Sequence, residues 1–262
     1  MGHQRLGRIA KSRKWRAVVD GVMGGGGLAS DDIGRIAALT LDAAGPALRN
    51  GTNDAVLRHT FYLLTQIALA AREPDWRGRL AGVGITLSED ASLFDLTVGL
   101  HTAVDRQARL AGYTSDLGEM AQQAAGEALA ALAGNQATTL FGSGGEHLQK
   151  AIRGLSTRVG FAELGQAFFG RFLSRFLGFY LSRVTAQAAG SSRVPSVAAM
   201  SQFDAALEAH CWQSARIVQD FCGQWYSKTE YVEGIDSRNT SRFMAVALRK
   251  LSDELSQQRA EG

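Results

Sequence analysis

The sequence predicts an all-α protein: a single-domain bundle of seven to eight helices with a central aromatic helix and a basic N-terminal arm. Apolar residues recur at three- and four-residue steps along nearly the whole chain, and runs that alternate apolar and polar residues are scarce. Only 3 of the 262 residues are proline. This scarcity favours helices, because a proline in a helix interior costs about 3 kcal/mol.

Charge and glycine content divide the chain into a basic arm with a glycine hinge, residues 1–29, and a helical domain, residues 30–262. Six positive charges precede the first acidic residue, Asp20, although the net charge of the whole chain is only +3. Four consecutive glycines at 24–27 favour a hinge that lets the arm move. The basic residues of the arm are Arg5, Arg8, Lys11, Arg13, Lys14 and Arg16.

Capping and breaking residues set the limits of the first two helices. Ser30 is a good N-cap, and the two aspartates that follow it suit the positive end of a helix dipole. This first helix is expected to end near Pro46, and Asn53 is expected to cap the second. The segment 73–87, with its glycines and a proline, is the longest predicted connection, with a short strand at 83–87.

The remaining chain contains six predicted helices, separated by stretches of glycine, serine or proline. Ser88, followed by two acidic residues, is the expected N-cap of the first of them. The predicted ranges are 88–110, 115–141, 146–154, 157–189, 197–227 and 237–258.

The helix expected at 157–189 is apolar over most of its circumference and is therefore predicted to lie at the centre of the bundle. At 100° per residue, Phe172 and Phe179 share one stripe, and leucines extend the apolar surface around the other side. Arg175 lies close to this stripe, so it should find a carboxylate, an aromatic face or a binding partner. Alternatively, the Arg-edged face forms a groove for a protein partner or meets a membrane surface. The candidate interface residues are Phe172, Arg171, Arg175, Phe176 and Phe179.

The helix expected at 197–227 carries both cysteines of the chain on or beside an apolar stripe with a heptad-like step. Cys211 and Cys222 are eleven residues apart, which is about 16 Å along a helix axis. This separation exceeds the reach of a disulfide. We therefore expect two buried thiols in a reducing compartment.

Candidate catalytic residues are few. His101 and Asp105 share a helix face at i, i+4, which is a weak pattern for an oriented general base. The sequence has no HExxH motif and no cysteine pair at zinc spacing, so no metal site and no cofactor are expected. The glycine-rich segment 142–145 lacks the Gly-Lys-Ser/Thr ending of a phosphate loop and is predicted to connect two helices.

The basic arm is the strongest functional lead in the sequence. Trp15 lies among its positive charges, a pattern that suits docking on a protein partner, stacking on nucleic acid or lying on an anionic membrane surface. The most apolar stretch, 168–184, is interrupted by arginines, so no transmembrane segment is expected. Abundant alanine and 23 arginines against 5 lysines favour a bacterial, GC-rich source.

Together these features predict a cytoplasmic, non-enzymatic interaction or scaffold subunit of a multi-protein assembly. It would contact its partners through the basic arm and the Arg-edged aromatic helix. A nucleic-acid-associated component that uses the arm is the first alternative. A membrane-acting effector is the second.

Overall fold

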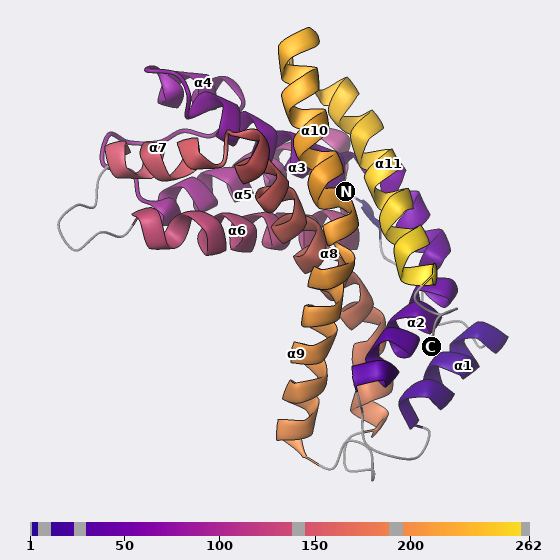
Figure 1. Ribbon diagram of the computed structural model, residues 1–262. Helices are drawn as coiled ribbons and strands as arrows, with labels where there is room; N and C mark the ends of the chain where they lie inside the picture. The colour runs from indigo at the N-terminus through magenta and orange to yellow at the C-terminus, as the bar shows by residue number, and fades with distance from the viewer. Residues whose placement is uncertain (1, 5–11, 24–29, 138–144, 189–195, 258–262) are drawn as a thin grey trace.

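The computed structural model describes residues 2–4, 12–23, 30–137, 145–188 and 196–257, and it confirms that the protein is all-α (Figure 1). Within these ranges there are eleven α-helices, one 3-10 turn and two short strands. In chain order they are β1 (Gly2–Gln4), α1 (Arg13–Met23), α2 (Ser30–Asn50), η1 (Gly51–Asn53), α3 (Ala55–Ala70), α4 (Trp76–Gly82), α5 (Leu93–Ala111), β2 (Tyr113–Ser115), α6 (Asp116–Ala137), α7 (Gly145–Gly154), α8 (Arg158–Ala188), α9 (Val197–Ser214), α10 (Arg216–Val232) and α11 (Ser237–Gln257).

Helix α8 is the element around which the others pack. It contacts α6, α9 and α10 extensively along its length. In Figure 1, α5, α6 and α7 extend to one side of α8, whereas α9 runs down beside its C-terminal half. The five fully buried phenylalanines of α8 explain this position, because their apolar surface must be covered on several sides. They are Phe161, Phe168, Phe169, Phe172 and Phe176.

Part of the expected basic arm is a helix that packs onto the core. Trp15 of α1 is only 6% exposed, and its ring stacks on Tyr180 of α8 with a centroid distance of 5.2 Å. Val18 and Val22, one and two turns further on, are fully buried. The hinge at 24–27 lies outside the described residues, so the predicted domain division stays a prediction.

Helix α2 continues through Pro46 instead of ending there. Proline has no N–H, so the carbonyl of Asp42, four residues earlier, lacks its usual helical donor. The ammonium group of Lys14 donates to this carbonyl at 3.3 Å and to the Asp42 carboxylate at 2.7 Å. The proline in α2 therefore creates an acceptor that helps to dock α1.

The long helix expected at 197–227 is divided into α9 and α10 at Ala215. The hydroxyl of Ser214 donates to the carbonyl of His210 at 2.9 Å, and this type of bond bends helices. Ala215 itself is fully buried. Both α9 and α10 contact α8.

Two helix N-caps lie later in the chain than predicted: the cap of α3 by one residue and the cap of α5 by four residues. Asp54, rather than Asn53, caps α3 by accepting two backbone N–H bonds. Ser92, rather than Ser88, caps α5 and forms a capping box with Asp95.

The short strands lie where none was predicted. The backbone of β1 pairs in parallel with β2, next to the left-handed Gly112 that ends α5. The strand expected at 83–87 is not formed, because residues 83–84 make a turn and residues 85–87 pair with no other described strand. No helix among the described residues is long and apolar enough to cross a bilayer.

Both thiols are free and buried, as predicted. Burial raises the pKa of Cys211 to about 12 and also raises the pKa of Cys222. Cys222 sits in the contact between α10 and α8, opposite Gly165. A Cβ atom at Gly165 would collide with the Cys222 sulfur, so glycine is what permits this close helix packing.

Replacing Trp15 by alanine is expected to destabilise the protein by about 3–5 kcal/mol, because a large buried aromatic ring is lost. The loss should also raise amide hydrogen exchange in residues 13–23. Urea unfolding and exchange mass spectrometry measure the two effects. Arg16→Ala, an exposed change in the same helix, is the control and should stay within about 0.5 kcal/mol of wild type. Equal stability of the two variants would contradict the docking of α1 through Trp15.

Candidate functional site

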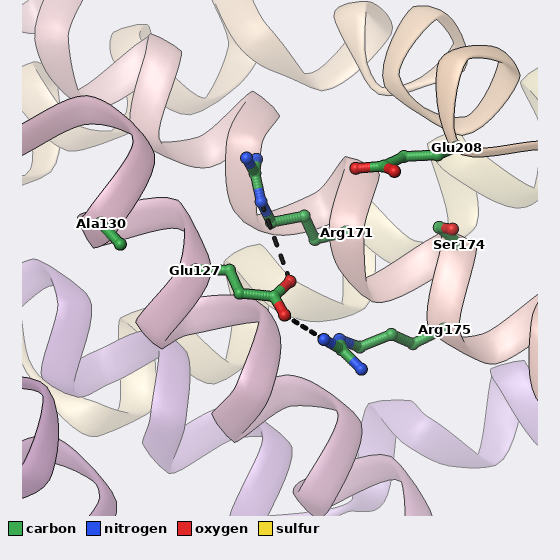
Figure 2. Close-up of a pocket in the computed structure, with 6 residues that line it drawn as sticks. All are labelled: Glu127, Ala130, Arg171, Ser174, Arg175 and Glu208. Atoms are coloured by element: carbon green, nitrogen blue, oxygen red, sulfur yellow. Dashed lines mark hydrogen bonds and ion pairs between the residues drawn. The ribbon is translucent and has the colours of Figure 1, made fainter. Parts of the chain in front are cut away.

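A charged hollow of about 510 Å³ lies between α6, α8 and α9 (Figure 2). Arg171, Ser174 and Arg175 share one face of α8, since they are spaced at i, i+3 and i+4. The five buried phenylalanines of α8 face the core, so this polar face is left at the surface. The hollow is lined by Glu127, Ala130, Arg171, Ser174, Arg175 and Glu208.

Two guanidinium groups in the hollow share the carboxylate of Glu127. One Nη atom of Arg175 pairs with Glu127, and the other donates to the side-chain oxygen of Gln123 at 2.7 Å. Arg171 Nε lies 3.9 Å from the second oxygen of Glu127. The Arg171 guanidinium also lies 5.8 Å from the ring centroid of Trp212. Glu127 therefore ties α6 to two successive turns of α8.

The carboxylate of Glu208 faces the same hollow from α9, as Figure 2 shows. It makes no hydrogen bond or ion pair with another described residue. The two arginines already have partners, whereas Glu208 retains its full capacity to accept. The hollow thus offers a negative acceptor beside a paired positive cluster.

An apolar groove of about 460 Å³ adjoins the hollow, and it shares Glu127 and Ala130 with it. Its most exposed large side chain is Phe94, which is 74% exposed. Gly126 of α6 faces α5, because a Cβ atom at this position would lie 3.0 Å from the side chain of Thr97. The remaining lining residues are Leu93, Thr97, His101 and Gln123. We call the hollow and the groove together the interaction face.

His101 lines the groove and Asp105 lies one turn further along α5, but their side chains are not hydrogen-bonded to each other. The side chain of Gln122 donates to the carboxylate of Asp105 at 3.1 Å and to the backbone carbonyl of His101 at 3.0 Å. The Nε2 atom of His101 is buried without a described hydrogen-bond partner. Over the described ranges, no group of three or more His, Cys, Asp or Glu side chains is arranged to hold a metal.

The predicted Arg-edged interface is divided between surface and core. Arg171 and Arg175 line the interaction face, with 20% and 32% of their side chains exposed. Phe179 is half-buried. Phe172 and Phe176 are fully buried, which corrects the expectation that they offer surface to a partner, because α8 is covered on those sides.

Of the predicted contact residues of the basic arm, three are exposed, one is buried, and three lie outside the described residues. Arg13, Lys14 and Arg16 are exposed on α1. Trp15 is buried, so its indole is not available to stack on a base while α1 is docked, contrary to expectation. Arg5, Arg8 and Lys11 lie outside the described residues.

Several residues of the interaction face were missed in the sequence. Glu127 and Glu208 belong to different helices, and nothing in the sequence links them to Arg171. Phe94 follows Leu93 in an apolar pattern, and its exposure depends on how α5 is rotated against α6. The only available signal was the requirement that Arg175 find a carboxylate, which Glu127 fulfils.

Comparisons with known proteins give no relative for this chain: no family model, no curated protein and no solved structure matches it.

Replacing Glu127 by glutamine is expected to destabilise the protein by about 1 kcal/mol, because the charged link between α6 and α8 is lost. Urea unfolding at low salt measures this change, and high salt should reduce it. The control is Glu163→Gln, which removes an exposed carboxylate from α8 away from the hollow. If the two variants are equally stable, the ion pairs of Glu127 do not contribute.

Proposed function

We propose that this chain is a non-enzymatic interaction or scaffold subunit of a bacterial multi-protein assembly, and that it docks a partner helix on the interaction face. The observation that carries the proposal is the continuity of the face: an exposed phenylalanine, an apolar groove and a paired arginine cluster adjoin one another across four helices. Aromatic residues and arginines dominate the binding energy of many protein interfaces.

The chemistry of the face defines the partner. A groove between two helices, lined by Leu93, Phe94 and Ala130, suits the apolar stripe of an amphipathic helix. Arg171 and Arg175 already pair with the carboxylate of Glu127. An acidic group of the partner would therefore gain less binding energy from these arginines than a basic group would gain from Glu208. The partner is therefore an amphipathic helix with a lysine or arginine beside its apolar stripe.

Affinity capture from the native host tests this function. We expect the wild-type protein to capture a partner protein, and the Phe94→Asp and Glu208→Lys variants to capture at least about 10-fold less of it. Phe94→Asp removes the apolar contact with the partner helix, and Glu208→Lys removes the contact with its basic residue. A chemical crosslinker installed at position 94 should reach an amphipathic helix of that protein.

Leu110→Asp is the matched control for this capture, since Leu110 is 77% exposed on the same helix as Phe94 but does not line the interaction face. It should retain the partner as wild type does. Equal losses in Leu110→Asp and Phe94→Asp, or unchanged capture by both Phe94→Asp and Glu208→Lys, would contradict docking on this face.

Nucleic-acid binding is the second candidate function, and the exposed cluster of Arg13, Lys14 and Arg16 favours it. Such binding would rest on phosphate contacts without base stacking by Trp15, so it should weaken steeply with salt. Fluorescence anisotropy with labelled single- and double-stranded DNA measures it. Arg13→Gln with Arg16→Gln should reduce both the affinity and its salt dependence. If the affinity for DNA does not change with salt concentration, or does not change when the two arginines are replaced, this function is eliminated.

A further inference from the structure

A second pocket, separate from the interaction face, lies between α2 and α11. Its volume is about 420 Å³, which is within the usual range of small-molecule sites. Leu48 and Leu248, each at most 2% exposed, form an apolar floor that is continuous with the protein core. The remaining lining residues are Arg49, Thr52, Ala245, Arg249, Ser252 and Asp253.

The two arginines of this pocket come from different helices and are exposed. Neither Arg49 nor Arg249 forms a side-chain hydrogen bond or an ion pair with another described residue. The hydroxyl of Ser252 likewise donates to no described group, whereas that of Thr52 already donates to the carbonyl of Arg49 at 2.8 Å. The pocket thus presents two guanidinium groups and one hydroxyl as uncommitted donors.

The charge of the lining limits the ligand. The two arginines and Asp253 give the pocket lining a net charge of +1. A ligand with one negative charge neutralises this lining, whereas a second negative charge on the ligand would be repelled by the carboxylate of Asp253. A guanidinium group recognises a carboxylate through paired N–H bonds. The leucine floor requires an apolar body on the same molecule.

From this combination we propose that the pocket binds a small amphipathic monocarboxylate, with its carboxylate held by Arg49, Arg249 and Ser252 and its hydrocarbon part lying on Leu48 and Leu248. The site goes beyond the proposed docking function, since it shares no lining residue with the interaction face. A partner helix and the carboxylate can therefore be tested independently.

Isothermal titration calorimetry with octanoate tests the proposal on the full-length protein. We expect one octanoate per chain, bound at least about 10-fold more tightly than octylammonium, which has the opposite charge, and than acetate, which lacks the apolar body. Arg49→Gln and Arg249→Gln should each weaken octanoate binding by about 10-fold, because each removes one charge-assisted contact. Ala245→Phe should abolish binding by filling the pocket.

Arg242→Gln is the matched control, because it removes an exposed arginine from α11 outside the pocket and should leave the affinity for octanoate unchanged. Phe94→Asp should also bind octanoate normally, which separates this site from the proposed function. Thermal melts confirm that each variant is folded. Absent or multi-site binding, an equal affinity for octylammonium, or an affinity unaffected by both pocket arginines would overturn the proposal.

Discussion

The structure depends on the burial of one ring, Phe61 of α3. Its centroid lies between 5.2 and 6.3 Å from those of five other aromatic rings. These rings come from α8, α10 and α11, so a single side chain joins four helices. Aromatic pairs add about 0.5–1.5 kcal/mol each beyond the area that they bury. The five partners are Phe161, Phe168, Phe169, Trp225 and Phe243.

The polar surfaces are a consequence of this core. The buried rings fix the rotation of α8, and that rotation leaves Arg171, Ser174 and Arg175 in the hollow. Glu127 then links α6 to the same face of α8. The interaction face is therefore held by rigid helices rather than by loops, a property that suits recognition by a preformed surface.

Local sequence logic predicted the all-α class and several helix limits well, because periodicity and glycine breaks are properties of short segments. The predicted helix at 157–189 matches α8 closely. The docking of Trp15 could not be predicted, since it depends on Tyr180, which is 165 residues away along the chain. The same holds for the candidate site, where Glu127, Arg171 and Glu208 meet only after three helices pack.

The close contact between Gly165 and Cys222 limits how the sequence can diverge. A side chain at position 165 fits only if position 222 becomes smaller or α10 moves away from α8. The second route would disturb Trp225 and Tyr226, which lie one turn further along α10 and contact the central aromatic cluster. Positions 165 and 222 should therefore vary together among relatives of this protein, as a pair whose combined volume is conserved.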